Sequence, residues 1–341
     1  MDSLTGNIGV CLTLWFRTRS DPHIQRFNAP ACVPKPMRPE SIPLGSGEPT
    51  KRPSMQVIGI GGAGCNTISH MGEEGIAVCS DKKHSATMRS RRILKLTENQ
   101  VRSARTLDPK YAHTLNLEWL EHLKEHVDRP DIVFIFVGLG GETGSYVSPL
   151  VASTCQKVAK LVVVSASEPF SVEGTDRRSV AQEGRLRLQS CCDIPIIYSN
   201  DPLLQMAPNL PIRKAFNVME QIMLSPVYEM IDVLTQEDVK GVRDDFHGCT
   251  KVRLGVGYGG SSLERVPVAV EDAFTSPWFD SAPDEARSAV VVVNSCEPDP
   301  YLLDDVMKDV TSRLPRAKIR YSARCDPALE RRIKVTLLVG W

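Results

Sequence analysis

The chain has no excess of charge of either sign, since 41 Lys and Arg residues balance 41 Asp and Glu residues. Proteins that bind nucleic acid or a membrane surface usually carry a basic patch, so the balance argues against both. No apolar run approaches the roughly 18 residues that a membrane span requires. The apolar segment 8–16 lacks the basic residues and the cleavage site of a signal peptide. These absences predict a cytoplasmic protein that binds no nucleic acid.

The ten cysteines include no CxxC pair. Scattered cysteines of this kind are expected to be buried thiols in a reducing compartment, and not disulfides or zinc ligands. His122 and His126 lie four residues apart on a predicted helix, as zinc ligands can, but no third ligand is apparent. We therefore expect a solvated helix face at these histidines and no metal site.

The most informative segment that is present is VGLGGETGS, residues 137–145. It follows the apolar run 131–137, which is typical of a buried strand, and it precedes a helical stretch of small residues, 147–159. A strand, a glycine-rich turn and a helix N-terminus in this order present backbone N–H groups to an anion, usually a phosphate. A second such turn, GIGGAGCN at 59–66, follows the predicted strand 55–58. Two phosphate turns on one sheet carry more weight than one, because a single GxGxxG-like match is weak.

Residues 1–54 hold a cluster of prolines between Pro22 and Pro53 and show no helical or strand period. We expect a disordered extension or a linker there. Met37 and Met55 leave open a native start further along the chain.

From Met55 onward, short apolar strands alternate with helical patterns. This alternation predicts an α/β fold with a mostly parallel sheet that is covered on both faces. A long helix is expected from Pro211 to about Val233, with a kink at Pro226. The strands expected in this part are 56–60, 76–79, 93–96, 132–137, 161–165 and 195–198, and the helices are 111–127 and 176–190.

A second, smaller α+β domain is expected to follow the long helix. Its predicted helices are 235–247, 266–275 and 301–314, and its predicted strands are 252–256, 289–294, 319–323 and 333–339. The chain is thus divided into the extension, a first domain at 55–208, the central helix at 209–234 and a C-terminal domain at 235–341.

Several motifs of the chain, in the order in which they occur, resemble those of the tubulin/FtsZ superfamily. GGAGCN at 61–66 is similar to the first glycine turn of the family. GGETGSY at 140–146 is similar to its signature, GGGTG followed by Thr or Ser and Gly. PFSVEGTDR at 169–177 looks like the ribose loop PFxxEGxxR. The match extends from about residue 55 to residue 341.

Two shorter matches complete the resemblance. Asn200-Asp201 is similar to the loop that follows the ribose loop, and Ala215-Phe216 to the start of the central helix. The chain looks like a divergent prokaryotic FtsZ-like protein, with an archaeal one left open.

The resemblance implies a Rossmann-like GTPase domain that binds GTP or GDP, with Mg²⁺ as a candidate ion, a long central helix and a smaller C-terminal domain. In the family, subunits assemble head to tail, and an acidic loop of one subunit completes the hydrolytic site of the next. Backbone N–H groups hold the phosphates without a P-loop lysine, so catalysis depends on a polar group delivered in trans. The implied partners are further copies of the chain and a standard FtsZ.

Carried over by position, the resemblance assigns two phosphate turns and contacts to the ribose and the base. Glu173 would accept hydrogen bonds from the ribose hydroxyls, with Arg177 beside it. Phe216 would stack on guanine, a contact worth roughly 1–3 kcal/mol. Surface charge for Arg177 and core packing for Phe216 are the alternatives. The nucleotide-binding candidates are Gly61, Gly62, Ala63, Gly64, Cys65, Asn66, Gly140, Gly141, Glu142, Thr143, Gly144, Ser145, Glu173, Arg177, Asn200, Phe216 and Gln221.

Two residues of the second turn depart from the family. Glu142 replaces the third glycine, and a carboxylate about 5 Å from a phosphate oxygen costs roughly 3 kcal/mol at an effective dielectric of 20. This cost is avoided if Glu142 turns outward, pairs with Arg or holds a cation. If it is not avoided, Glu142→Gly is expected to tighten nucleotide binding. Tyr146 replaces the last glycine and is expected to crowd the site.

The base-reading Asp of the family aligns with Gln221, which directly follows Glu220. A Gln carbonyl accepts a hydrogen bond without charge assistance, so discrimination for guanine is expected to be weaker. The glycine-rich segment near the γ-phosphate is replaced by SARTLDP at 103–109, where Arg102 and Arg105 could compensate by charge.

The acidic loop after the central helix is altered as well. Only Asp238 keeps its place, and it is the candidate catalytic residue in trans, while Thr235 stands where the first Asp of the family should be. The connection is shorter by about eight residues, or up to about 26 Å of extended chain. Asp232 or Glu237 could substitute, but hydrolysis is expected to be weak.

The leading hypothesis is a guanine-nucleotide-binding, FtsZ-like cytoskeletal or cell-division protein with weakened hydrolysis in trans. The alternative is a non-hydrolysing regulator or co-assembly partner of a standard FtsZ. The chain ends inside a predicted strand, without the tail by which many FtsZ proteins reach the membrane, so no direct membrane binding is expected. A third hypothesis is an NAD-dependent oxidoreductase in which Asp81 binds the ribose of the cofactor. It leaves the second phosphate turn unexplained.

Overall fold

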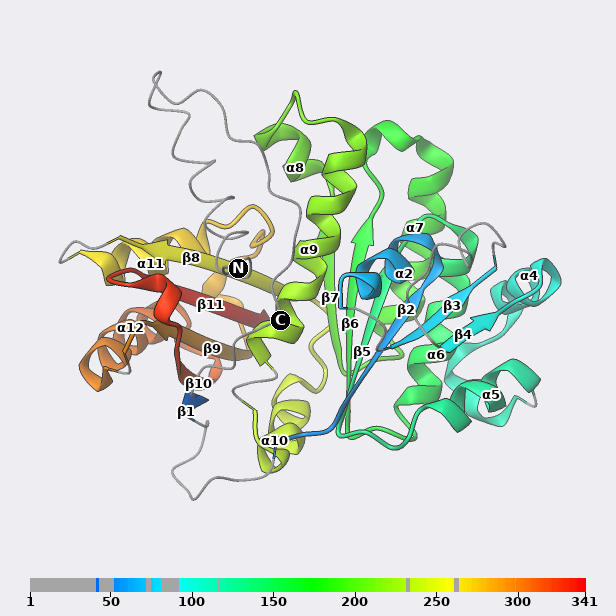
Figure 1. The fold of residues 1–341 in the computed structure, drawn as a ribbon, viewed down its shortest axis with the longest axis horizontal. Helices are drawn as coiled ribbons and strands as arrows, with labels where there is room; N and C mark the ends of the chain where they lie inside the picture. Colours follow the sequence, from blue (N-terminus) through cyan, green and yellow to red (C-terminus); the bar gives the residue numbers. More distant parts are fainter. Residues whose placement is uncertain are drawn as a thin grey trace. The chain divides into compact units, whose positions relative to one another are not determined.

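Figure 1 shows the computed structural model of the 341-residue chain. The structure describes residues 41–42, 52–71, 75–80, 92–115, 117–230, 234–260, 264–297 and 299–341. The chain divides into two compact units. The larger unit comprises Glu48–Val252 and Gly340–Trp341, and the smaller unit comprises Met1–Gly47 and Arg253–Val339.

The larger unit is built on a parallel sheet with the strand order β7-β6-β5-β2-β3-β4. Its central strand, β5, consists almost entirely of Val, Ile and Phe, and residues 132–137 of it are fully buried, as expected for a sheet covered on both faces. The predicted α/β class is therefore confirmed. The strands are β2 (Met55–Ile60), β3 (Ile76–Cys79), β4 (Arg92–Lys95), β5 (Ile132–Gly138), β6 (Leu161–Glu168) and β7 (Ile194–Ser199).

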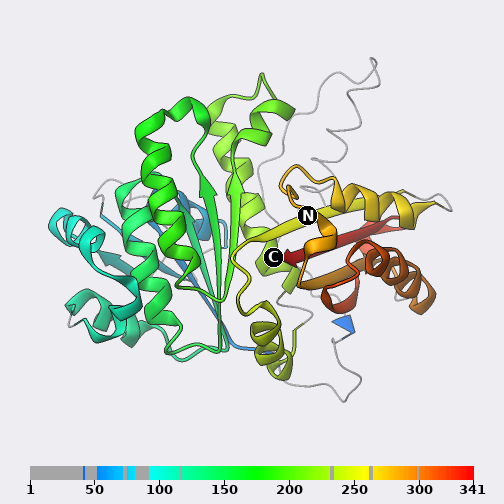
Figure 2. The same ribbon diagram turned by 180° about the vertical axis from the view of Figure 1, so that it is seen from behind.

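Helices cover both faces of this sheet. Helices α2 (Gly61–Ser69) and α9 (Ile212–Met230) lie over one face (Figure 1), and α6 (Ser148–Cys155) and α7 (Thr175–Gln189) lie over the other, which Figure 2 shows from behind. The remaining helical segments are α4 (Glu98–Thr106), η2 (Pro109–Thr114), α5 (Glu118–His126), η3 (Thr143–Val147), η4 (Ser171–Glu173), α8 (Asp201–Met206) and α10 (Gln236–Phe246).

Some predicted helices differ from the observed ones. The helix predicted at 111–127 is two segments, η2 and α5, because Leu115 and Leu117 have extended backbone conformations. The central helix begins at Ile212 and continues through Pro226 to Met230, and a kink there stays a prediction. Residues 231–233, which include Asp232, lie outside the described residues.

A buried carboxylate, Asp131, lies just before β5 at the amino edge of the sheet and binds several neighbouring segments there. It accepts hydrogen bonds from Ser54 N at 2.7 Å and from Gln236 Nε2 at 3.0 Å, and it pairs with Lys160 Nζ at 2.6 Å. Burial alone raises its pKa, but the bond to Lys160 and those from Ser54 outweigh burial and lower the pKa from 3.8 to about 2. Asp131 thus ties α10, through Gln236, to this edge.

A second carboxylate, Asp193, does the same before β7. It accepts from Val162 N at 2.8 Å, Gln156 Nε2 at 3.0 Å and Arg243 Nε at 3.1 Å. Because Arg243 also belongs to α10, this helix is held at two places to the amino edge.

The smaller unit contains β1 (Ser41–Ile42), β8 (Val252–Gly259), β9 (Ser288–Ser295), β10 (Lys318–Cys325) and β11 (Ile333–Gly340), in the order β1-β10-β9-β11-β8. Helices α11 (Arg265–Phe274) and α12 (Pro300–Arg313) and the short turns η5 (Pro283–Glu285) and η6 (Pro327–Leu329) complete it. Strand β1 pairs with β10, so the expectation of no strand before residue 55 is wrong at Ser41–Ile42. The rest of that extension up to residue 51 lies outside the described residues.

Two general features can be stated for the described part of the chain. Eight cysteines are thiols, and Cys65, Cys79, Cys155, Cys191 and Cys249 among them are buried. Of the helices described, none is both long enough and apolar enough to cross a bilayer.

Candidate functional site

The first glycine turn lies tightly against the carboxyl edge of the larger unit's sheet. A Cβ on Gly64 would come within 2.0 Å of the Phe136 carbonyl oxygen in β5, and one on Gly59 within 2.4 Å of the Gly64 carbonyl oxygen. Only glycine allows these approaches between backbones. The thiol of Cys65 is buried and bonds to Gly59 O at 3.3 Å, so this residue offers a ligand its backbone and not its sulfur.

The second glycine turn lies beside the first. A Cβ on Gly61 would be 3.4 Å from Gly144 N, and the Thr143 hydroxyl bonds to the hydroxyl of Ser80 at the end of β3, at 2.8 Å. Gly140 has a φ of +93° and donates its N–H to Ser145 Oγ at 2.9 Å, which closes the turn. The two predicted turns therefore meet at one edge of the sheet.

The two helix N-termini at these turns suit an anion. The residue before α2, Ile60, supplies no side-chain acceptor to the first helical turn, and Glu142 supplies none to η3. Nothing lies within 4 Å of the position that a Cβ on Gly141 would take. Backbone N–H groups at such a helix start are the usual ligands of a phosphate.

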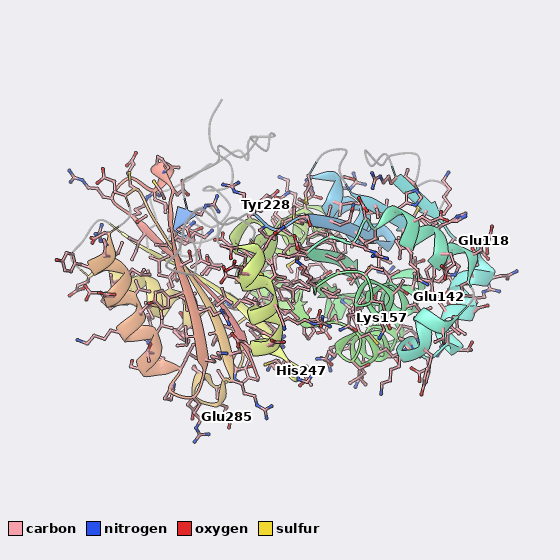
Figure 3. All side chains as sticks on the ribbon, turned by 90° about the horizontal axis from the view of Figure 1, so that it is seen from below. Glu118, Glu142, Lys157, Tyr228, His247 and Glu285 are labelled. Atoms are coloured by element: carbon pink, nitrogen blue, oxygen red, sulfur yellow. The ribbon has the colours of Figure 1, made fainter. Side chains whose placement is uncertain are left out.

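Glu142 is exposed, as expected for a carboxylate that turns outward (labelled in Figure 3). Among the described residues no hydrogen bond or ion pair is recorded for its side chain. Glu142 thus turns outward, which is the first of the three ways in which repulsion from a phosphate would be avoided.

Tyr146 does not crowd the glycine turns as predicted, because its side chain is buried between two helices. Its hydroxyl donates to Glu183 Oε2 in α7 at 3.3 Å, and the guanidinium of Arg105 in α4 lies 5.2 Å from the centre of its ring. Arg105 also pairs with Glu183 at 3.4 Å, and Arg102 lies 3.8 Å from Glu98. The charge of Arg105 is therefore engaged by Glu183 and the ring of Tyr146.

The ribose loop is held by its own side chains. Glu173 accepts from Phe170 N at 2.8 Å and pairs with Arg177, whose side chain is otherwise exposed. Asp201 Oδ1 accepts from Ser171 N at 2.7 Å. Glu173 keeps spare lone pairs for hydroxyl donors, since a carboxylate has about four acceptor positions.

Asn200 offers the clearest sign of a missing partner. It is only 3% exposed, and its Oδ1 has no hydrogen-bond partner among the described residues. A buried, unpaired amide oxygen in a native structure requires an explanation, and a ligand donor is one. Its position at the carboxyl end of β7 fits a nucleotide at the same sheet edge.

On the central helix, Phe216 contacts the ribose loop and Glu220 contacts the first glycine turn. Phe216 packs edge to face on Phe170, with ring centres 5.3 Å apart. Glu220 accepts from Asn66 Nδ2 at 3.1 Å and contacts His70 Nε2 at 3.0 Å, whereas the next residue, Gln221, is only partly buried.

Glu220 was not among the site residues predicted from the sequence, and the base-reading role of Gln221 stays a prediction. Residues four apart share a face of a helix, so Glu220 lies on the face of Phe216, and Gln221, five residues away, does not. The structure also turns the Asn66 side chain toward Glu220, although Asn66 was expected to hold phosphate.

Asp238, the candidate acid in trans, occupies a helix cap. Its Oδ2 accepts from Thr235 N at 3.0 Å and Thr235 Oγ1 at 2.6 Å, while Asp238 N donates to Thr235 Oγ1 at 3.3 Å. This capping box starts α10. The neighbouring Glu237 is exposed.

The described residues include no cluster of three or more His, Cys, Asp or Glu side chains that could hold a metal ion. His126 Nδ1 bonds to the carbonyl oxygen of His122 at 2.7 Å, as within an ordinary helix. Mg²⁺ at this site would therefore depend on phosphate oxygens and hydroxyls such as those of Ser80 and Thr143.

The model of the Tubulin/FtsZ family, GTPase domain, matches residues 54–208. Cell division protein FtsZ 1 of Archaeoglobus fulgidus is 31% identical over 301 residues, which cover 84% of this chain and 81% of that protein.

Solved structures agree with the sequence relatives. The FtsZ dimer of M. jannaschii superposes with a TM-score of 0.72 at 29% identity, over 85% of this chain and 89% of that one. CetZ2 from Haloferax volcanii, in a GTPγS-bound protofilament, gives a TM-score of 0.66 at 16% identity, over 84% and 92% of the two chains. At that identity the second likeness concerns the fold alone.

Proposed function

Because the chain belongs to the tubulin/FtsZ family of GTPases and cytoskeletal proteins, we propose that it binds GTP or GDP where its two glycine turns meet. It assembles head to tail with copies of itself and hydrolyses GTP slowly or not at all. The observation that carries the proposal is the contact between the turns, with Gly61 against Gly144.

Each part of a guanine nucleotide has a chemically suitable neighbour at this edge. The N–H groups of Gly61 to Gly64 and of Thr143 to Ser145 suit the phosphates. The ribose hydroxyls would contact Glu173, and the orphaned Oδ1 of Asn200 would accept from the nucleotide. On the central helix, Phe216 would contact the ring of the base, and Glu220 takes over the base-reading role that was expected of Gln221.

Weak hydrolysis is supported by the residues of the acidic loop. The carboxylate of Asp238 is committed to capping α10, and that helix is held at Asp131 and Asp193. Thr235 has no carboxylate to offer a neighbour. The acid that would orient water in the next subunit is therefore poorly available, and the electrostatic contribution to catalysis falls.

Nucleotide binding is tested first by extracting the freshly purified protein and identifying the nucleotide by mass spectrometry. Titration with GDP then compares two adjacent substitutions on α9. Glu220→Gln is expected to weaken GDP binding at least about tenfold, the value of a hydrogen bond to a charged group. Gln221→Leu, the matched control, leaves it within about twofold. Absence of guanine nucleotide, together with no measurable GDP binding, would disprove the proposal.

Assembly and hydrolysis are tested by sedimentation and phosphate release with GTP. We expect polymer with hydrolysis far below that of a standard FtsZ, and full turnover in the polymer would contradict the weak site. The second candidate, a non-hydrolysing co-assembly partner, is favoured by the capped Asp238. It predicts sedimentation with a standard FtsZ but not alone.

A further inference from the structure

Glu220 is a buried carboxylate whose two oxygens are held by helix α2 and by the residue that directly follows it. It is 6% exposed, with Asn66 Nδ2 at 3.1 Å from Oε1 and His70 Nε2 at 3.0 Å from Oε2. Asn66 and His70 are four residues apart and so lie on one face of α2. Since α2 begins at the first glycine turn, these two contacts tie that turn to the central helix.

Two donors on two different oxygens fix more than the position of the carboxylate. They also fix the rotation of its plane, because turning the group would break one bond or the other. Burial makes that loss costly, since a buried carboxylate cannot exchange the lost donor for water. Glu220 is therefore held in one orientation.

A carboxylate fixed in this way retains acceptor capacity. Each oxygen has two lone pairs, so one on each remains for a ligand after Asn66 and His70 are satisfied. The two inner lone pairs of a carboxylate are nearly parallel and match two adjacent N–H donors, such as N1–H and the 2-amino group of guanine. This pairing requires Asn66 and His70 to occupy the outer lone pairs. A carboxylate that has turned about its bond presents one oxygen and matches one donor.

We propose that His70 is a positioning residue for nucleobase selectivity, and that its bond to Glu220 keeps both carboxylate oxygens facing a base that carries two donors. The inference rests on the function proposed above, in which Glu220 reads the base. Without the donor of His70, Glu220 turns toward Asn66, and purines with and without the 2-amino group bind alike.

The test compares GDP with IDP, which lacks the 2-amino group, by titration of the full chain. The wild-type protein is expected to prefer GDP at least about tenfold, because the additional bond is made to a charged acceptor. His70→Leu is expected to reduce this preference to less than about threefold. His70→Gln, which keeps an N–H donor, restores most of it.

A matched control removes a histidine elsewhere in the larger unit. His247 is exposed beyond the end of α10 (labelled in Figure 3), and His247→Leu should leave the preference unchanged. Thermal unfolding in each case identifies the variants that are folded.

Two results would overturn the inference while the proposed function stands. One is a wild-type protein that binds GDP without preferring it to IDP. The other is a folded His70→Leu variant with the wild-type preference, including the case in which both affinities fall by the same factor, as a purely structural role predicts. A wild-type protein that binds neither nucleotide overturns the proposed function, and the role of His70 with it.

Discussion

Removing the charge of Glu142 should strengthen nucleotide binding, but only modestly. The side chain is exposed, so its carboxylate is screened by water and not by protein. At about 5 Å from one phosphate charge, the repulsion is about 0.8 kcal/mol with the dielectric of water, compared with about 3 kcal/mol with a value of 20. We therefore expect Glu142→Gln, which keeps the shape of the side chain, to lower the Kd for GDP about threefold to fourfold at low salt.

The salt dependence makes this prediction specific. The Debye length is about 30 Å at 0.01 M salt and about 3 Å at 1 M, so the gain should disappear at the higher concentration. Isothermal titration with GDP at both concentrations measures it. Glu118→Gln, which makes the same charge change on the exposed face of α5 (Figure 3), is the matched control and should have no effect at either concentration.

Two outcomes would refute the reasoning about Glu142. A gain of more than about thirtyfold, or one that persists at 1 M salt, would mean that the carboxylate is desolvated against the phosphates. No gain at low salt would mean that the phosphates lie well beyond its reach.

Two further predictions concern stability. The pKa of Asp131 is lowered from 3.8 to about 2, so its charged form stabilises the fold above the ordinary pKa, and that contribution is lost as pH falls through about 2. Asp131→Asn should therefore lower the free energy of unfolding at pH 7 by about 2 kcal/mol in urea titrations. The exposed Asp128→Asn should not lower it, and equal effects would contradict the role of Asp131. Gly64→Ala should lower the free energy of unfolding, measured by thermal unfolding, by about 3 kcal/mol, because its Cβ would meet the Phe136 carbonyl oxygen. Gly141→Ala is the control, because a Cβ there has open space. An unchanged stability of Gly64→Ala would show that the turn is loosely packed.

Strands β3 and β5 were predictable because each is a short apolar run with clear ends, whereas β6 continues beyond its predicted end through Ser167 to Glu168. The prediction 76–79 coincides with β3, and 132–137 differs from β5 by one residue. Helices α2 and α4 were not predicted as helices. Helix α2 is rich in glycine. Helix α4 buries only Val101 and Ala104, and two buried residues are too few to show the helical period of apolar positions in the sequence.

The local structure of the glycine turns was predictable where close backbone contacts require glycine, as at Gly64 and Gly144. It was not predictable where a side chain could turn in more than one direction. Tyr146 was expected to point at the turns, yet it packs between helices, because Glu183 and Arg105 supply a hydrogen bond and a cation there. These partners are distant in sequence, so no local pattern could reveal them.

The carboxyl edge of the larger unit's sheet carries the glycine turns, and its amino edge carries the two carboxylates that anchor α10. If copies stack head to tail as proposed above, each contact joins two unlike surfaces, and the stack has two chemically different ends. A copy altered only at α10 would still join such a stack through its glycine turns but would offer the next copy a faulty surface. A minor fraction of that variant, mixed with the wild type, would thus act as a chain terminator at one end alone.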